Sequence, residues 1–352
     1  MSERMESLDG LRGIAALSVV VQHFTTDTKW YADFFLFAGS VGVALFFVLS
    51  GFLMGHLYGG ASFSAPAVVA FWLKRIGRVV PLYLVCVFTA YGYFELTGTN
   101  RPMFTVTWDM FWQHLLFIDA QSLMWTIPRE MQFYAVFPLI WLGLTLHRGA
   151  TSLALCAALV VLAIFHYESP YVVLFRSAHF FIIGVLASLI RIDRDQIYDV
   201  PFVILMFGYF ISWPGVLDAI GLTGAHGNVW SSPIYLVLLP ALVVAAVNSP
   251  LASRVLGCMP LTYVGTISYS VYLLHAPVFW TLFMFTPLAN WPRPLLFLVD
   301  LLVVGIAASA SYYYFESPLR RWVGDLRSAD AVHDAGYSLR AGKCAGSAID
   351  KP

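Results

Sequence analysis

Two side chains that could bind charge and carry protons share one apolar stretch near the start of the sequence. Arg12 and His23 stand eleven residues apart, and no other charged residue lies between them. At 3.6 residues per turn, a helix would place both side chains on one face, roughly 16 Å apart along its axis. Ionisable residues inside a bilayer are costly and mark functional sites, so the spacing predicts a path that joins Arg12 to His23. The structural alternative is that Arg12 reaches the membrane surface while His23 hydrogen-bonds a neighbouring helix.

Arg75 and Arg78 form a second candidate site. They are three residues apart in the stretch FWLKRIGRVVPLY, which we interpret as a loop followed by the start of a span at Pro81. On a helix they would share a face, where two guanidinium groups make a good fork for phosphate. The alternative is an ordinary positive cluster that contacts lipid head groups.

Three more ionisable residues lie in or beside apolar segments. Glu130 stands at the start of the segment 130–147 near the outer surface, where its carboxylate could orient a histidine or accept a proton from a substrate. Arg176 and His179 lie within 171–190 at a spacing of three, and we expect them on one helical face. An arginine inside a membrane should pair with a carboxylate, for which Glu130 is a candidate, or line a polar cavity.

The last two apolar segments carry polar side chains as well. Ser268, Tyr272 and His275 lie close to one helical stripe, where they could serve a site or form hydrogen bonds across helices. Glu316 stands at the end of the final segment, where a carboxylate opposes the helix dipole, so we expect it to pair with an arginine. The candidate partners are Arg12, Arg75 and Arg78.

The composition is that of an integral membrane protein. Hydrophobic residues make up 59% of the 352 residues and charged residues only 11%, with a mean hydropathy of +0.75. Soluble domains carry about 25% charged residues. The net charge is zero, so the chain lacks the basic surface that nucleic-acid binding requires. The four cysteines form no close pair, which argues against a disulfide framework or a zinc site, and we expect no metal.

We predict an all-α, polytopic transmembrane helix bundle of about ten spans. This bundle forms one domain over residues 1–323, and the polar residues 324–352 form a flexible cytoplasmic tail. The segment 104–118 is too short and too polar for a span, and we interpret it as interfacial. The predicted spans are about 10–27, 34–58, 79–98, 130–147, 150–167, 171–190, 200–213, 233–248, 267–287 and 295–316.

The placement of lysine and arginine predicts that both termini are cytoplasmic. With that orientation, every inside loop and the region after the last span carry at least one basic residue. The outside loops carry only four. The inside residues are Lys74, Arg75, Arg78, Arg148, Arg191, Arg194, Arg254, Arg320, Arg321 and Arg327, and the outside residues are Lys29, Arg101, Arg129 and Arg293.

These motifs, in this order over residues 8–318, resemble the membrane-bound acyltransferase family 3. Each motif is weak alone, but the order and spacing make the resemblance specific. One departure concerns Glu130, because the family pattern Trp-Ser-Leu-x-x-Glu is Trp-Thr-Ile-Pro-Arg-Glu here. The matching motifs are Arg-x10-His at Arg12 and His23, beginning in LDGLRGIAAL, FFVLSGF at 46–52, Arg-x-x-Arg at Arg75 and Arg78, Trp-Thr-x-x-x-Glu at Trp125 to Glu130, Ser-Tyr-Ser-x-Tyr-Leu-x-His at 268–275, and Phe-Glu-x-Pro at Glu316 and Pro318.

The resemblance implies an O-acyltransferase of a bacterial inner (plasma) membrane. The family transfers acyl groups to sugars of lipopolysaccharide, exopolysaccharide, Nod factors, peptidoglycan and some antibiotics. Its usual donor is cytoplasmic acetyl-CoA or a related acyl-CoA. The implied partners are therefore acyl-CoA, a carbohydrate or glycolipid acceptor and the lipid bilayer, without nucleic acid.

Together the residues and the resemblance predict a mechanism. Arg75 and Arg78, with Arg12, would hold the coenzyme A phosphates, and the pantetheine arm would thread between helices towards His23. As a general base, His23 would remove the proton of an acceptor hydroxyl. Glu130, together with Arg176 and His275, could orient His23 or stabilise charge, and an acyl-histidine intermediate stays open as a second route.

Three other interpretations remain open at the level of sequence. The first is a transporter or flippase for a lipid-linked glycan, with Arg176 and Glu130 along its substrate path. A second is a sensor or scaffold without chemistry, although that would leave the ionisable residues of several spans unexplained. A third is a different membrane acyltransferase fold that pairs a histidine with an asparagine.

Overall fold

The computed structural model describes residues 5–99, 103–165, 172–190, 193–222 and 228–322, and every regular element in these ranges is helical. The predicted all-α class is therefore confirmed, while the predicted tail at 324–352 lies outside the described residues. The α-helices are α1 (Glu6–Thr28), α2 (Ala38–Tyr58), α3 (Ala65–Thr97), α4 (Trp108–Leu115), α5 (Thr126–Leu146), α6 (Arg148–Phe165), α7 (Ala178–Ser188), α8 (Asp199–Ile211), α9 (Pro214–Ala219), α10 (Pro233–Asn248), α11 (Pro250–Leu256), α12 (Met259–Thr266), α13 (Ser268–Phe285) and α14 (Arg293–Ser311). Shorter 3-10 or π turns are η1 (Ser122–Trp125), η2 (Val173–Arg176), η3 (Gln196–Tyr198), η4 (Pro287–Asn290) and η5 (Tyr312–Glu316).

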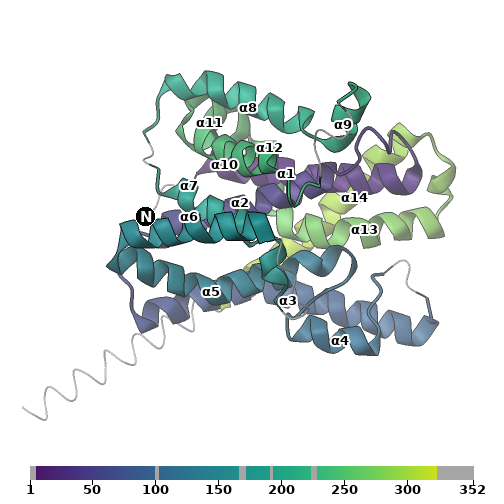
Figure 1. Cartoon of the computed structure of the whole chain (residues 1–352). Coiled ribbons are helices and arrows are strands. Elements are labelled where there is room, and N and C mark those ends of the chain that lie inside the picture. Colours follow the sequence, from purple (N-terminus) through teal and green to yellow (C-terminus); the bar gives the residue numbers. More distant parts are fainter. Residues whose placement is uncertain (1–4, 100–102, 166–171, 191–192, 223–227, 323–352) are drawn as a thin grey trace, which may run out of the picture.

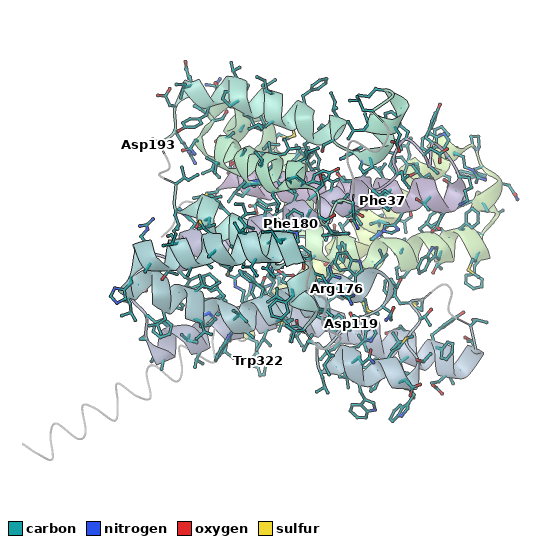
Figure 2. All side chains as sticks on the ribbon, in the orientation of Figure 1. Phe37, Asp119, Arg176, Phe180, Asp193 and Trp322 are labelled. Carbon is teal, nitrogen blue, oxygen red and sulfur yellow. The ribbon has the colours of Figure 1, made fainter. Side chains whose placement is uncertain are left out.

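The helices α1 and α2 form the middle of the bundle. Both contact α10, which lies on the side of α8 and α11, while α3 and α5 lie on the opposite side (Figure 1). The α13–α14 hairpin packs against α1. Side chains fill the spaces between these helices, and Phe180, which is fully buried, lies in the interior (Figure 2). The arrangement places α1, which carries Arg12 and His23, in contact with the elements that hold the other candidate residues.

Glycines permit the close crossing of α2 and α7. A β-carbon added at Gly51 would lie 2.1 Å from the backbone oxygen of Phe181, and one at Gly184 would lie 2.2 Å from that of Val48. Any side chain at either position would push the helices apart. The absence of a side chain at Gly51 and Gly184 therefore allows the two backbones to approach closely.

The predicted loop before the third span is helical instead, because Arg75 and Arg78 lie inside one continuous helix. Ser64 caps α3 through its side chain, and the helix then runs for 33 residues with Pro81 inside it. Thirty-three residues extend for about 50 Å, longer than the hydrocarbon core, so the helix accommodates a charged turn and an apolar span in succession. The expectation that the two arginines share a helical face is met.

The expected single helix over 171–190 is wrong. Within this range the structure has the 3-10 turn η2, which ends at Arg176, and then the 11-residue helix α7, which begins after Ser177. Ser177 adopts a non-helical conformation and separates the two elements. Arg176 and His179 therefore do not share a face of one helix.

The outer surface of the bundle is apolar over long stripes. On α14, Leu298, Leu302 and Ile306 each expose more than 60% of their surface, while Leu296 and Val304 on the opposite face are buried. Stripes of this kind are unusual on soluble proteins and indicate a hydrocarbon environment.

The described helices differ in whether they are long and apolar enough to cross a membrane. By length and composition, three of the described helices could cross a bilayer, or five if two bent pairs each count as one span. The pairs are α10 with α11, bent by 96°, and α12 with α13, bent by 76°. Three more apolar helices are shorter. The predicted count of ten and the cytoplasmic termini stay predictions.

Candidate active site

Arginines from two helices line one side of a pocket inside the bundle, which we name the arginine pocket. Arg12 reaches it from α1, and Arg75 and Arg78 reach it from α3. Glu130 is its acidic lining residue, so the ionisable lining carries an excess of positive charge. The polar lining residues are Arg12, Ser50, Arg75, Arg78, Thr126, Glu130, Tyr134, Ser268, Tyr269 and Tyr272.

Hydrogen bonds fix the carboxylate of the arginine pocket. One oxygen of Glu130 accepts hydrogen bonds from Ser50 Oγ at 3.3 Å and from the hydroxyl of Tyr134, one turn further along α5. The guanidinium of Arg75 lies over the Tyr134 ring, 5.7 Å from its centroid. The three elements α2, α3 and α5 are thus joined at this wall of the pocket, through Ser50, Arg75 and Tyr134.

Glu130 lines the arginine pocket and not the histidine pocket, so its predicted role in orienting a histidine stays a prediction. Glu130 lies in the second turn of α5, and the chain enters that helix from the turn η1, so its side chain points into the arginine pocket. Sequence position alone placed it at the outer end of a span. The turn η1, which no periodicity indicates, precedes the helix that carries it.

A second pocket contains His23 and is mainly aromatic and polar, and we name it the histidine pocket. Trp125 and Trp280 line it from η1 and α13, and Gln22 lines it beside His23 on α1. The Gln22 side-chain oxygen accepts a 2.7 Å hydrogen bond from the Gly39 amide, which ties α1 to the start of α2. The remaining lining residues are Val19, Gly39, Ser40, Val43, Ser122, Leu123 and Tyr272.

His23 and His275 form a pair at the histidine pocket. Their ring centroids are 5.3 Å apart, with the rings tilted by 42°. Nδ1 of His275 lies 3.1 Å from the carbonyl oxygen of Val271 and 2.8 Å from that of Tyr272. Because a carbonyl oxygen only accepts, Nδ1 carries a proton, and Nε2 is the lone-pair nitrogen of the neutral ring. The structure therefore brings together two histidines that are 252 residues apart in the sequence.

The two pockets meet at Val43 and Tyr272, which line both. The Tyr272 hydroxyl donates a 2.7 Å hydrogen bond to the carbonyl oxygen of Leu123, which holds the ring in place. Arg12 and His23 line different pockets, and both lie on the single helix α1 that the sequence predicts for them. The path between Arg12 and His23 that the sequence predicts stays a prediction, and the structure shows two pockets that share Val43 and Tyr272.

The stripe on α13 contributes to both pockets. Ser268 and Tyr272 line the arginine pocket, and His275 adjoins His23, so the three predicted residues do gather along one helix. Ser268 is buried, and its hydroxyl has no hydrogen-bond partner within the described residues. A ligand in the arginine pocket could use that hydroxyl.

The predicted partners of Glu316 are wrong. Its carboxylate is buried and pairs with Arg320 at 2.9 Å, one turn further along the chain, and also accepts a hydrogen bond from Ser270. Glu316 ends the π turn η5, which rotates the chain so that the carboxylate faces α13. Its role is to join α13 to the end of α14, beside the arginine pocket.

Neither Arg176 nor His179 lines the arginine or the histidine pocket. Arg176 ends the turn η2, which packs against α5, and His179 is buried in the first turn of α7. The break at Ser177 directs these side chains elsewhere. The structure thus places neither residue in the lining of the two pockets.

Several pocket residues were not predicted from the sequence. Tyr134 shares a helix face with Glu130, and a spacing of four could have found it. The indole nitrogen of Trp280 donates a 2.7 Å hydrogen bond to Asp27, which lies one turn beyond His23 on α1. Asp27 therefore places a carboxylate close to the histidine pocket. Its spacing of four residues from His23 on one helix could have indicated this from the sequence.

Comparison with known proteins identifies the family. The chain matches the family model of an acyltransferase domain, acyltransferase 3, over residues 5–314. The O-acetyltransferase OatA of Staphylococcus aureus is 24% identical over 370 aligned positions, which cover 90% of this chain and 57% of the relative. The putative peptidoglycan O-acetyltransferase YrhL of Bacillus subtilis is 24% identical over 360 positions, covering 89% and 54%. No solved structure matches the chain.

The match over most of the chain shows that this protein belongs to the acyltransferase 3 family. The resemblance seen in the sequence motifs is thereby confirmed. The chain spans a little over half the length of the relatives it matches.

Proposed function

We propose that this member of the acyltransferase 3 family transfers an acyl group, acetyl above all, from acyl-CoA to a hydroxyl of a carbohydrate acceptor. The observation that carries the proposal is the junction of the two pockets at Val43 and Tyr272. One pocket is rich in arginine, which suits an anion, and the other contains His23, whose ring lies beside that of His275. A donor in the first and an acceptor in the second would meet at Tyr272.

The arginine pocket suits the donor. Coenzyme A carries phosphate groups, and guanidinium groups bind phosphate through paired, charge-assisted hydrogen bonds. Arg75 and Arg78 lie one turn apart on α3, and Arg12 faces them from α1. The lysine and arginine distribution supports a cytoplasmic opening for this pocket, which is the side on which acyl-CoA is made.

The histidine pocket suits a sugar acceptor. Tryptophan rings offer apolar faces against which the C–H groups of a sugar can pack, while amide and hydroxyl groups satisfy sugar hydroxyls. Trp125 and Trp280 provide the rings, and Gln22, Ser40 and Ser122 provide the polar groups. The name of the Bacillus subtilis relative includes peptidoglycan, so a glycan of the cell wall is the first acceptor to test.

The chemistry proposed for the junction is direct transfer. The acceptor oxygen attacks the thioester carbonyl carbon as His23 takes its proton, and the thiolate of coenzyme A leaves when the tetrahedral intermediate collapses. The proton on His23 then passes to that thiolate, so the ester and free coenzyme A are the products. General-base assistance contributes about 10²–10⁴-fold, and the positioning of donor and acceptor in adjoining pockets supplies further acceleration.

The test compares cells that carry the wild-type protein with cells that carry His23→Ala at equal membrane abundance. Mass spectrometry of cell-surface glycans, lipids and secreted metabolites looks for an ester-linked acyl group. We expect the ester with the wild type and its loss with the variant. Identical ester content together with a change in which glycan reaches the surface would overturn the proposal in favour of transport.

A further inference from the structure

One tryptophan of the histidine pocket is held by a charged side chain. The indole nitrogen of Trp280 donates a 2.7 Å hydrogen bond to Oδ2 of Asp27 on α1. A carboxylate at the end of the predicted span 10–27 is costly, so its position indicates a role. Trp280 lines the histidine pocket, whereas Asp27 lines neither of the two pockets. The structure therefore connects Asp27 to the pocket through the Trp280 ring.

The packing of α13 along α1 brings these two residues together. The rings of His23 on α1 and His275 on α13 lie 5.3 Å apart. Asp27 and Trp280 form a second contact, about one turn further along both helices. Both contacts advance along the two helices in the same direction, so α1 and α13 lie side by side and run parallel. The hydrogen bond is thus placed at the level directly beyond the histidine pair.

The rest of the Trp280 ring is packed on other sides. Phe104, which is buried, meets it edge to face, with 6.0 Å between the ring centroids. A small apolar cluster formed by α1, α13 and α14 also packs against it. The side chain is only partly buried, and it contributes to the lining of the histidine pocket. These contacts fix where the indole lies, and the hydrogen bond to Asp27 fixes which edge of the ring points to α1.

A ring that is already fixed before binding favours affinity. An indole offers an apolar face to the C–H groups of a sugar, but only when it is held at the right angle. Ordering one mobile side chain on binding lowers affinity by about 3- to 10-fold. The hydrogen bond between Trp280 and Asp27 removes this cost, because the ring is ordered in the free protein.

We propose that Asp27 is a positioning residue for the acceptor: its carboxylate holds the Trp280 N–H, so that the indole forms a fixed flat wall against which a sugar packs. The inference rests on the proposed acyl transfer to a carbohydrate. Asp27 itself does not touch the acceptor in this arrangement. Its effect on the acceptor passes through the orientation of the Trp280 ring.

The first experiment measures acetyl transfer from acetyl-CoA to the disaccharide that a muramidase releases from peptidoglycan. Asp27→Ala removes the hydrogen-bond acceptor, so the KM for the disaccharide should rise by about 3- to 10-fold, with the KM for acetyl-CoA unchanged. Asp27→Asn retains an oxygen that accepts the indole N–H, so its KM should stay within about twofold of the wild type. Because the charge of Asp27 also acts on His23, the readout is the KM and not kcat.

A fluorine label reports on the ring itself. In protein grown with 5-fluorotryptophan, the Trp280 signal is identified by its absence from Trp280→Phe. Without acetyl-CoA, the disaccharide should shift this signal in the wild type and in Asp27→Asn at concentrations about 3- to 10-fold lower than in Asp27→Ala. Asp33→Ala, which removes an exposed carboxylate of the loop after α1, is the control and should behave as the wild type.

A double-mutant cycle closes the test. Asp27→Ala and Trp280→Phe remove opposite ends of one hydrogen bond, so the double variant should exceed the larger single effect on KM by no more than about twofold. Trp280→Phe also supplies the test if Asp27→Ala does not fold.

Three results would overturn the inference while acyl transfer by the wild type stands. They are equal KM increases in Asp27→Asn and Asp27→Ala, full additivity in the cycle, and a Trp280 signal that does not respond to a disaccharide that the enzyme acetylates. A wild type that transfers no acetyl group would overturn the proposed function itself, and this inference with it.

Discussion

The arginine pocket and the histidine pocket adjoin each other, but their lining residues differ in charge and polarity. The first gathers Arg12, Arg75 and Arg78 around one hydrogen-bonded carboxylate, Glu130. The second places His23 among tryptophans and uncharged polar groups. Binding a polyanion needs charge, whereas proton transfer and sugar binding need a base and flat apolar surfaces. The contrast indicates that recognition of the donor and activation of the acceptor are performed by separate residues.

The largest expected effect comes from the histidine pocket. His23→Ala should lower kcat for acyl transfer by about 10²–10⁴-fold because the general base is lost. The affinity for acyl-CoA should stay unchanged, since His23 does not line the arginine pocket. Steady-state kinetics with purified protein provide the measurement. His56→Ala, on α2 and outside both pockets, is the matched control and should keep wild-type kcat.

The arginine pocket should respond in the opposite way. Arg75→Ala should raise the KM for acyl-CoA by about 10- to 100-fold, because a hydrogen bond between charged groups is worth about 1.5–3 kcal/mol. The measured kcat at saturating donor should change little. Lys74→Ala removes an exposed charge from the adjacent position and is the control. A fall in kcat at unchanged KM would contradict the assignment of Arg75 to donor binding.

A variant with a smaller effect should distinguish the binding site of the acceptor from that of the donor. Trp280→Phe retains a ring but removes the N–H that donates to Asp27 at 2.7 Å. We expect the KM for the acceptor to rise by about 3- to 10-fold, the value of one lost hydrogen bond, with the KM for acyl-CoA unchanged. Trp291→Phe, at the exposed end of η4, serves as the control. Equal increases in both KM values would contradict this prediction, because they would indicate that donor and acceptor bind in one site.

The smallest expected effect is on the folding stability that His114 provides on α4, outside the predicted spans. On α4, burial lowers the pKa of His114, although its hydrogen bond to Met110 and the nearby Asp119 oppose the shift. Nε2 of the ring accepts the Gln121 amide at 3.3 Å, which requires the neutral form. The unfolded chain takes up the proton first, so this stability is complete above about pH 6.5 and is lost as the pH falls below it.

Thermal unfolding in detergent between pH 7.5 and 5 measures this contribution. We expect the unfolding temperature of the wild type to fall over that range, and His114→Gln to show a smaller decrease. Kinetic constants at pH 7.5 should be the same for both proteins. An equally steep decrease in the variant would assign the pH dependence to other groups.

The sequence predicts the arginine pocket better than any other part of the molecule. Charged residues in apolar helices are conspicuous because each is costly there, and Arg12, Arg75 and Arg78 do converge. The same reasoning should have found Asp300, a buried carboxyl that the segment 295–316 carries in addition to Glu316. Its position at intervals of four from buried apolar residues was the available signal.

The features that the sequence did not predict depend on local backbone turns and on contacts between distant segments. The break at Ser177 has no glycine or proline beside it, so periodicity favoured one helix that carried both Arg176 and His179. Glu316 was assigned to distant arginines because a π turn cannot be seen in a sequence. The pairing of His23 with His275 depends on how α13 packs on α1, which propensity does not encode.

The separation of the two pockets can be tested directly by protection from alkylation. In a background without the native cysteines, Ser50→Cys places a thiol in the arginine pocket and Ser40→Cys places one in the histidine pocket. Purified variants are treated with a small maleimide, with and without saturating coenzyme A. We predict that coenzyme A slows the labelling of the first thiol by about tenfold or more, as bound ligand blocks it, and leaves the second within about twofold. Protection of the Ser40→Cys thiol alone, or of neither thiol, would contradict the assignment of donor and acceptor to separate pockets.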